Sequence, residues 1–399
     1  MMNIAQPKQK SRLLSFNAVV LAVVVAIVSI GLLNLRNADF YSADSFHERQ
    51  TRWYLLGFVL ATLVAVTDLH LISRLAYVAY AASLVLLVAV LFTEPINNSR
   101  RWIFGIQPSE FSKITTVLAL ARYFHDKRMK GRGDSVGIRR WIQIATPFLI
   151  MLGPVCLIFL EPDLGTALIV VLIGLSMIFF QGVRVRSLIT AVGIVGLIFP
   201  LAWRFALHDY QKARVLVWWD PDALAEQYQE ARDIAKAEPS ADAKKQVRRL
   251  KKILDKAYQP KQAVIAIGSG EFYGKGGRQG HATRQRHLPY LHTDFVIATW
   301  GEERGFIGCT LLLTLYYFLC YGALRVTKIA RDQFQALLAV GICATIFWQF
   351  FVNVGMVTGL LPVVGVALPL LSYGGSSVLS ICLGLGLLAN VVRRQRATG

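Results

Sequence analysis

The chain has 399 residues, of which 55% are hydrophobic and 17% are charged, and this composition is too apolar for an ordinary soluble globular protein. Its formal net charge of +19 would suggest nucleic-acid binding in a soluble chain, but most basic residues lie in short segments between apolar runs, where they orient membrane proteins. We therefore predict an all-α polytopic integral membrane protein that binds no nucleic acid. The five cysteines lie in apolar segments without CxxC spacing and are interpreted as small core residues.

Apolar segments of sufficient length predict about ten transmembrane helices, at 13–34, 52–67, 72–93, 104–124, 141–160, 164–181, 187–206, 295–324, 333–357 and 374–392. The first segment lacks a small-residue cleavage site, so we predict an uncleaved helix rather than a signal peptide. With the N-terminus in the cytoplasm, the inside loops carry most of the Lys and Arg, so both termini are predicted to be cytoplasmic. Residues 1–399 form one membrane domain in this interpretation, with a long extracytoplasmic loop at 207–294.

The segment 101–124 is unusual because its first half carries Gln107, Ser109, Glu110 and Lys113. On a helix, Glu110 lies three residues before Lys113, so the two charges share a face and can pair inside the protein. Two interpretations stay open. The pair fixes the register of the helix, or it lines a substrate cavity.

A second acid lies in the motif EPDLGTA, which follows Leu160. Pro162 suits a first helical position and would place Asp163 in the first turn, where the helix dipole favours a carboxylate. Asp163 is therefore either a capping residue or a functional acid.

The middle of the long loop, residues 222–258, is rich in Ala, Glu, Gln, Lys and Arg and is predicted to form two helical pieces that are separated at Pro239-Ser240. In the second piece, Val247, Leu250 and Leu254 recur at helical spacing opposite a basic face. Such a helix can lie on anionic lipid headgroups, offer a groove to a partner, or belong to a solvated hairpin.

The stretch 268–308 brings glycines, basic residues and an acid to the start of an apolar run. Its GSGEFYGKGG part is no nucleotide-binding loop, because Gly276 rather than Ser or Thr follows Lys275. Basic side chains here could still contact a pyrophosphate. An acid at the start of a membrane helix is costly unless it is used, so Asp294 is the first functional candidate. The histidines show no metal-binding spacing, and we predict no dedicated metal site.

Past residue 357, the run TGLLPVVGVALPLLSYGGSSVLS interrupts an apolar segment with prolines and glycines. Broken backbone at membrane depth is tolerated only when it is buried in protein or lines a cavity. The hydroxyls of Ser372 and Ser376 could therefore contact an anion or a sugar, although a tight interhelical turn is the alternative.

The blocks RRWIFGIQPSEFSK, EPDLGTA, HLPYLHTDFVIATWGEERGFIG and NVGMVTGLLPVVGVALPLLSYGGSS together resemble the signature of the SEDS family (shape, elongation, division and sporulation) over nearly the whole chain. GKG in the outer loop and LPVVGVALPLLSYGGSS are more similar to the elongation branch than to the division branch. The departures are Tyr290 where Glu is usual, Arg304 where Leu is usual, and a longer insert near 222–258.

This resemblance implies a SEDS fold and a peptidoglycan glycosyltransferase of the cytoplasmic (inner) membrane that polymerises lipid II on the outer face during elongation and rod-shape maintenance. It implies that the family's essential acid is Asp294 and that its conserved tryptophan is Trp102, for which an interfacial anchor is the alternative. The implied partners are a class B penicillin-binding protein acting as transpeptidase, other elongation-complex proteins and membrane lipids. Alternative activities are a lipid II flippase, a division-type glycosyltransferase and a structural membrane hub.

Because lipid II is α-linked and the glycan is β-1,4-linked, the implied reaction inverts the anomeric carbon in one displacement. Asp294 is the expected general base, and undecaprenyl pyrophosphate is the leaving group. Arg101, Lys113, Arg284 or Arg286 would meet the pyrophosphate charge; no cofactor is certain, and a divalent cation (Mg²⁺ or Mn²⁺) is the alternative. The candidate substrate-binding residues are Arg101, Trp102, Gln107, Ser109, Glu110, Lys113, Asp163, Lys275, Arg284, Arg286, His292, Glu303, Ser372 and Ser376.

Overall fold

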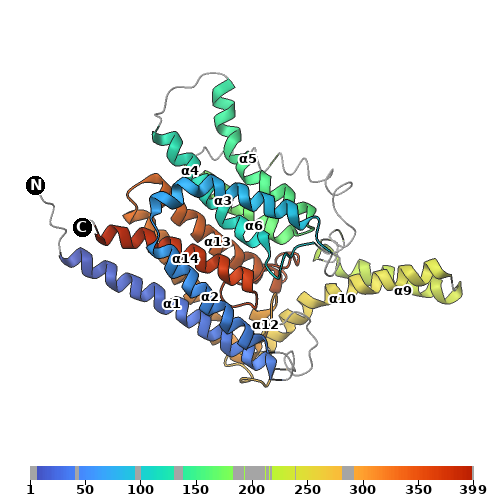
Figure 1. Ribbon diagram of the computed structural model, residues 1–399. Helices are drawn as coiled ribbons and strands as arrows, with labels where there is room; N and C mark the ends of the chain where they lie inside the picture. Colours follow the sequence, from blue (N-terminus) through green and yellow to red (C-terminus); the bar gives the residue numbers. More distant parts are fainter. Residues whose placement is uncertain are drawn as a thin grey trace, which may run out of the picture. The chain divides into compact units, whose positions relative to one another are not determined.

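The computed structural model describes residues 7–40, 45–94, 100–129, 138–182, 218–238, 240–280 and 292–397, and the single residues 193, 212 and 215. Within these ranges the chain is helical, and its only β-type pairing is an isolated bridge between Ile103 and Ile106 (Figure 1). The helices are α1 (Pro7–Asp39), α2 (Phe46–Val66), α3 (Leu69–Val90), α4 (Pro108–Met129), α5 (Ile138–Leu160), α6 (Leu164–Phe180), α9 (Pro221–Ala237), α10 (Ala241–Ser269), α12 (Val296–Ile329), α13 (Gln333–Val357) and α14 (Gly375–Ala397).

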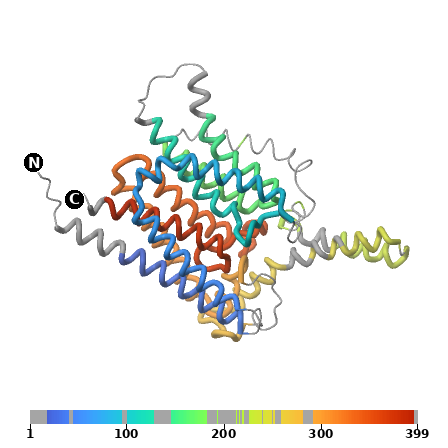
Figure 2. Tube along the Cα trace, viewed as in Figure 1, coloured from blue at the N-terminus to red at the C-terminus, as the bar shows by residue number. Residues whose placement is uncertain are grey.

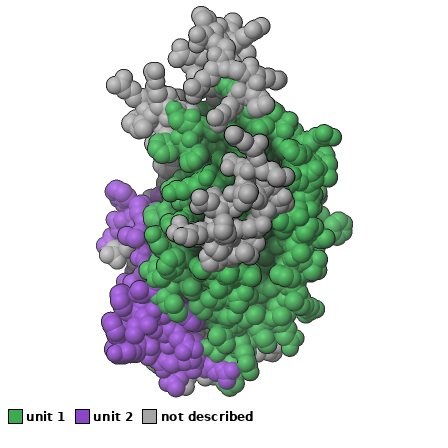
Figure 3. Space-filling view, turned by 90° about the vertical axis from the view of Figure 1, so that its left-hand side faces the viewer, with its two compact units in different colours: residues 1–184, 311–351, 366–399 green, residues 185–310, 352–365 purple. Residues whose placement is uncertain are grey.

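The chain divides into two compact units, which are coloured separately in Figure 3. Unit 1 comprises residues 1–184, 311–351 and 366–399, and unit 2 comprises residues 185–310 and 352–365. Helices α12 and α13 each contribute to both units.

Unit 1 is a helical bundle in which α14 packs on α2 and α4, and α4 also packs on α3, α5 and α6. Small residues permit close contact between α2 and α14. A Cβ atom at Gly386 would lie 2.6 Å from the carbonyl oxygen of Ala61, and one at Gly57 would lie 2.7 Å from the Sγ of Cys382. Close backbone approach of this kind is typical of helices that associate in a bilayer, where lipid and side chains are equally apolar.

Five of the described helical segments are long and apolar enough to cross a membrane: Ala18–Asp39, Leu69–Val90, Val296–Ile329, Gln333–Val357 and Gly375–Arg394. Ala145–Leu160 and Leu164–Phe180 are shorter apolar helices. Large apolar side chains on these and the neighbouring helices stay exposed, for example Val85 (68%) on α3 and Phe58 (66%) on α2, as expected for residues that face lipid. The prediction of an all-α integral membrane protein is confirmed.

The structure corrects several predicted boundaries. Helix α4 begins at Pro108 rather than near residue 104, because residues 103–106 form a tight turn that is closed by two backbone hydrogen bonds of 2.9 Å. Asp163 lies before the first turn of α6, as its N-cap, rather than within it. The two helical pieces of the insert are present, but the second continues to Ser269. Apart from residue 193, the predicted helix 187–206 lies outside the described residues.

Candidate functional site

In unit 1, Arg101 precedes α4 and ties the turn before this helix to the turn between α5 and α6. Its Nε donates to the carbonyl oxygen of Glu161 at 3.3 Å, and its Nη2 donates to the carbonyl oxygen of Pro162. Its Nη1 also lies 3.7 Å from Oδ1 of Asp163. Two backbone carbonyls and one carboxylate therefore surround this guanidinium.

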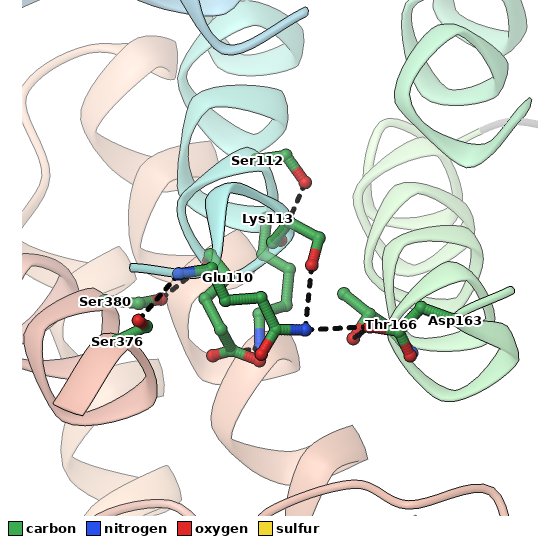
Figure 4. Close-up of polar contacts among 9 residues, drawn as sticks. Glu110, Ser112, Lys113, Asp163, Thr166, Ser376 and Ser380 are labelled. Atoms are coloured by element: carbon green, nitrogen blue, oxygen red, sulfur yellow. Dashed lines mark hydrogen bonds and ion pairs between the residues drawn. The ribbon is translucent and has the colours of Figure 1, made fainter. Parts of the chain in front are cut away.

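Asp163 is buried and joins α6 to the start of α4. It caps α6 by accepting from the backbone N–H of Thr166 at 3.3 Å and from the hydroxyl of that residue at 3.0 Å. The amide of Gln107 donates to Asp163 Oδ2 at 2.8 Å and to the hydroxyl of Ser109 at 3.0 Å (Figure 4). Asp163 is thus both the predicted cap and the centre of a polar network.

The predicted ion pair of α4 is present and buried. Lys113 Nζ lies 2.8 Å from Glu110 Oε2, and the Lys113 side chain is 1% exposed. Helix α14 borders this pair, because Ser380 donates to the carbonyl oxygen of Glu110 at 2.9 Å and Ser376 accepts from the backbone N–H of Gln107 at 2.9 Å (Figure 4). Lysine and glutamate are rarely buried this fully, and such a pair inside a membrane helix marks either a register device or a functional cavity.

Glu161, in the turn between α5 and α6, is the least satisfied acid among the described residues. It is fully buried, and neither carboxylate oxygen has a hydrogen-bond partner. Burial, assisted by the neighbouring Asp163, raises the pKa of Glu161 from 4.5 to about 8. Sequence reasoning missed this residue, although its position beside Asp163 at the end of an apolar run was a usable signal.

The interrupted segment before α14 has its backbone satisfied by side chains. Gln50 of α2 is fully buried; its amide donates to the carbonyl oxygen of Ser372 at 3.1 Å, and its carbonyl oxygen accepts from the N–H of Gly374 at 3.2 Å. The hydroxyl of Ser372 accepts from the N–H of Leu368 at 2.9 Å. Broken backbone at this depth is therefore buried in protein, and the hydroxyl of Ser372 serves that purpose.

In unit 2, Asp294 lies in the turn before α12, with His292 in the same turn, and both are half-buried. Asn353 of α13, which is fully buried, donates through Nδ2 to the backbone carbonyl of Asp294 at 3.0 Å. A Cβ atom at Gly365 would lie 3.4 Å from Asp294 Oδ2, so the carboxylate lies against the backbone of that glycine. Helix α13, through Asn353, and the segment that follows it, through Gly365, thus hold the candidate base.

Residues 271–276 pair with the backbone of α12 where this helix is interrupted at Gly305 (φ 64°, ψ −160°); we call this pairing the clasp. The N–H groups of residues 275 and 276 donate to the carbonyls of Glu302 and Glu303, at 3.0 and 3.1 Å. In return, the N–H groups of residues 306 and 307 donate to the carbonyls of residues 271 and 272, at 2.9 and 3.3 Å. The clasp replaces helical hydrogen bonds that the break at Gly305 removes.

Side chains reinforce the clasp. Lys275 Nζ lies 2.8 Å from Oε1 of Glu302, whose side chain is 1% exposed, and also donates to the hydroxyl of Ser269 at 2.7 Å. Oε1 of Glu303, which is buried, accepts from the backbone N–H of Arg278 at 2.9 Å. Lys275 and Glu303, both predicted substrate ligands, therefore have partners within the protein.

Apart from Trp102 and Ser372, the predicted site residues that the structure describes fall into two groups, one in each unit. The structure brings Arg101, Gln107, Ser109, Glu110, Lys113, Asp163 and Ser376 into one polar network in unit 1, which we call the α4–α6–α14 network. Unit 2 holds His292, Asp294, Lys275 and Glu303. Arg284 and Arg286 lie outside the described residues, and Trp102 is 38% exposed in unit 1.

Asn353 and Gln50 were also missed by sequence reasoning. Both are amides in apolar helices, and a polar side chain inside a membrane helix is a functional signal in itself. Across the described ranges, no group of three or more His, Cys, Asp or Glu side chains could hold a metal ion.

Comparisons with known proteins indicate the same family as the sequence motifs. The sequence profile of the FtsW/RodA/SpoVE family, described as "Cell cycle protein", matches residues 11–397. The peptidoglycan glycosyltransferase MrdB of Escherichia coli K12 is 33% identical over 349 residues, which covers 86% of this chain and 85% of the relative. The probable peptidoglycan glycosyltransferase FtsW of Trichlorobacter lovleyi is 31% identical over 395 residues, with 95% and 94% covered.

Solved structures are similar over almost the full length. A chain from a structure described as "Structural coordination of polymerization and crosslinking by a peptidoglycan synthase complex" matches with a TM-score of 0.71 and 30% identity, covering 94% of this chain and 97% of that one. The crystal structure of the rod shape determining protein RodA from Thermus thermophilus matches with a TM-score of 0.63 and 28% identity, covering 94% and 96%. The chain belongs to the FtsW/RodA/SpoVE family, which is the SEDS family, as a RodA-like member.

Proposed function

We propose that this protein is a peptidoglycan glycosyltransferase that polymerises lipid II into β-1,4-linked glycan strands, in the service of cell elongation and rod shape. The names of its relatives support the activity. The observation that carries the residue assignment is the position of Asp294, whose backbone is held by Asn353 and whose carboxylate lies against Gly365. A base whose backbone is fixed in this way is oriented before the substrate binds.

In the proposed step, Asp294 accepts the proton of the acceptor sugar's 4-hydroxyl while that oxygen attacks the anomeric carbon of the donor. The bond from this carbon to the pyrophosphate oxygen breaks, the configuration inverts, and undecaprenyl pyrophosphate leaves with the electron pair. The leaving group needs no proton if its charge is neutralised, so a second carboxylate is not required.

We assign neutralisation of the negative charge on the leaving group to the basic candidates Arg101, Lys113, Arg284 and Arg286. Among the described residues these are Lys113 and Arg101, and Lys113 already donates to Glu110 at 2.8 Å. Arg101 already contacts two carbonyls and Asp163, and this favours a role in fixing the turn. The described side chains do not form a metal site of their own, so Mg²⁺ or Mn²⁺ would bind chiefly through the pyrophosphate.

The runner-up activity is translocation of lipid II. The specific observation in its favour is the buried Glu110–Lys113 pair in α4, since intramembrane charges often line transport paths. A flippase does not need a base at Asp294, and this separates the two activities experimentally. An FtsW-like role in division is the alternative for the cellular process rather than for the chemistry.

We further propose that the protein works in the cytoplasmic membrane, with both termini in the cytoplasm, beside a crosslinking partner. One similar structure is described as a complex that coordinates polymerisation with crosslinking. By analogy, the partner here is a class B penicillin-binding protein, with other elongation-complex proteins and membrane lipids around it.

The decisive experiment is glycan polymerisation from labelled lipid II by purified protein, with and without the partner, comparing the wild type with Asp294→Asn at equal folded yield. We expect no polymer from the variant while lipid II binding is retained. Equal polymer from both proteins would remove Asp294 from the chemistry. Absence of polymer from both, with the partner present and with lipid II transported across vesicles, would favour the flippase.

A further inference from the structure

The insert in unit 2 forms an antiparallel helical hairpin, in which α9 and the first half of α10 run side by side (Figure 2). Its inner seam is apolar. Ala231 of α9 is buried, and Tyr228 on the same face is half-buried, as are Val247 and Leu250 of α10. The other faces of the two helices are exposed, and the proposed reaction uses none of their side chains.

Helix α9 carries an exposed acidic stripe. Glu226, Glu230 and Asp233 recur at spacings of four and three residues, so they share one face, and all three are exposed. Among the described residues, only Asp233 of these three forms an ion pair, with Lys236 at 3.2 Å. Beside the stripe, Ile234 leaves 59% of its surface exposed.

Helix α10 carries the matching basic stripe. Lys244, Arg248 and Lys251 have the same spacing of four and three residues, and all are exposed. None of them has an ion pair within the described part of the chain. Each hairpin therefore presents both halves of a complementary charge pattern, and no ion pair joins the two halves among the side chains that the structure describes.

The two stripes also lie at similar distances from the hairpin turn. At about 1.5 Å per residue, Glu230 is about 15 Å and Arg248 about 12 Å from Ser240 along the helix axes. Two copies in one membrane have their hairpins on the same side. A twofold axis parallel to the two helices of the hairpin would then bring α9 of one copy beside α10 of the other, with the stripes at similar positions along that axis.

We propose that the α9–α10 hairpin is a docking surface for a second copy of this chain, in which the acidic stripe of each copy pairs with the basic stripe of the other and the two Ile234 side chains lie near the contact. Exposed ion pairs are individually weak. Several act together here, and confinement to one membrane raises the effective concentration of the partner. The result is a reversible, salt-sensitive dimer.

The charge distribution favours a second copy over a polyanionic surface such as lipid headgroups. A helix that binds anionic lipid is rich in Lys and Arg on its polar face, and α10 taken alone meets this description. Here Glu226 and Glu230 lie in the same hairpin as Lys244 and Arg248, and an anionic surface would repel the acidic pair. A self-complementary pattern satisfies both stripes at once.

The test is energy transfer between donor-tagged and acceptor-tagged full-length proteins in phosphatidylcholine vesicles, which carry no net charge. Three variants are compared with the wild type: an acid-reversed form (Glu226→Lys with Glu230→Lys), a base-reversed form (Lys244→Glu with Arg248→Glu), and a control, Lys261→Glu, which reverses an exposed charge of α10 beyond the stripe. Helix content from circular dichroism verifies that each variant folds.

We expect each reversed variant alone to self-associate about tenfold more weakly than the wild type, and an equimolar mixture of the two to regain wild-type transfer. Lys261→Glu should match the wild type, and transfer should fall as salt is raised from about 0.1 M to about 1 M. Failure of the mixture to recover would overturn the proposal, as would unchanged transfer in both single variants. Association that requires anionic lipid and is lost only in the base-reversed variant would assign the hairpin to the membrane surface instead. The readout does not depend on glycan synthesis.

Discussion

The side-chain amide of Asn353 donates a 3.0 Å hydrogen bond to the backbone carbonyl of Asp294, from a position 59 residues further along the chain. The bond holds the main chain of the candidate base and is made to its backbone rather than to its carboxylate. It makes Asn353 a positioning residue rather than a catalytic one, and its contribution can be measured.

Asn353→Ala removes this donor and leaves a carbonyl without its partner. We expect kcat for glycan polymerisation to fall about tenfold with KM little changed, because a displaced base slows the chemical step more than binding. Gln349→Ala is a matched control, since Gln349 is another buried amide of α13, one turn earlier, whose side-chain atoms have no hydrogen-bond partner among the described residues. Equal losses in the two variants would reduce Asn353 to a packing role.

Gly365→Ala tests the contact of the carboxylate itself. A methyl group there would lie 3.4 Å from Asp294 Oδ2, at a backbone φ of 74° that is strained for alanine. Gly359→Ala provides the same strain without the contact, because Gly359 has φ 78° and nothing within 4 Å of its Cβ position. Both variants should lose about 1–2 kcal/mol of stability. Only Gly365→Ala should lower kcat, and similar kcat values in the two would argue against close contact with the base.

The Lys275–Glu302 ion pair distinguishes a structural clasp from a substrate site. Lys275→Met leaves the buried carboxylate of Glu302 without its cation, and we expect a loss of about 2–4 kcal/mol in the free energy of unfolding, measured in detergent by thermal denaturation. Lys236→Met breaks the exposed pair with Asp233 and should cost less than about 0.5 kcal/mol. A raised KM for lipid II at unchanged stability would contradict the structural role and support substrate binding by Lys275.

Stability should depend on pH through Glu161. Since its pKa is raised from 4.5 to about 8, the folded protein keeps a proton that the unfolded chain has released over this range, and stability therefore falls as pH rises through it. Glu161→Gln cannot titrate and should melt at least about 2 °C above the wild type at pH 8, with a much smaller difference near pH 5. Glu238→Gln, at an exposed acid, should not change the profile. Parallel pH profiles for Glu161→Gln and the wild type would mean that Glu161 is ionised and stabilised in the fold.

Helices α1 to α6 and α12 to α14 could be predicted from the sequence because crossing a bilayer demands long apolar runs, and these are visible without any knowledge of packing. The start of α4 was harder. Pro108 is a sound signal for a first helical position, but the apolar residues before it continued the pattern of the span. Two local hydrogen bonds between Ile103 and Ile106 close a turn before the helix, so α4 starts only at Pro108. Hydrophobic periodicity does not reveal such a turn.

The candidate site was predictable in its residue types and less so in its connections. Glu110 and Lys113 are three residues apart on one helix, so their pairing follows from geometry. Gln107 and Asp163 are 56 residues apart, and their contact depends on how α4 packs against α6. The position of Glu161 at the end of an apolar run was a usable signal, but the lack of partners for its carboxylate depends on the packing around it and is visible only in the fold.

Gly270, which directly precedes the clasp, and Gly274 within it change the interpretation of this glycine-rich motif. A Cβ at Gly270 would lie 2.1 Å from the carbonyl oxygen of Gly301, and one at Gly274 would lie 2.3 Å from that of Glu303. These positions are therefore small because another main chain occupies the space beside them. The glycine-rich sequence that resembles a phosphate-binding loop is explained here by close contact between two backbone segments. We therefore expect homologues to keep both glycines and to vary at the exposed Phe272 and Tyr273.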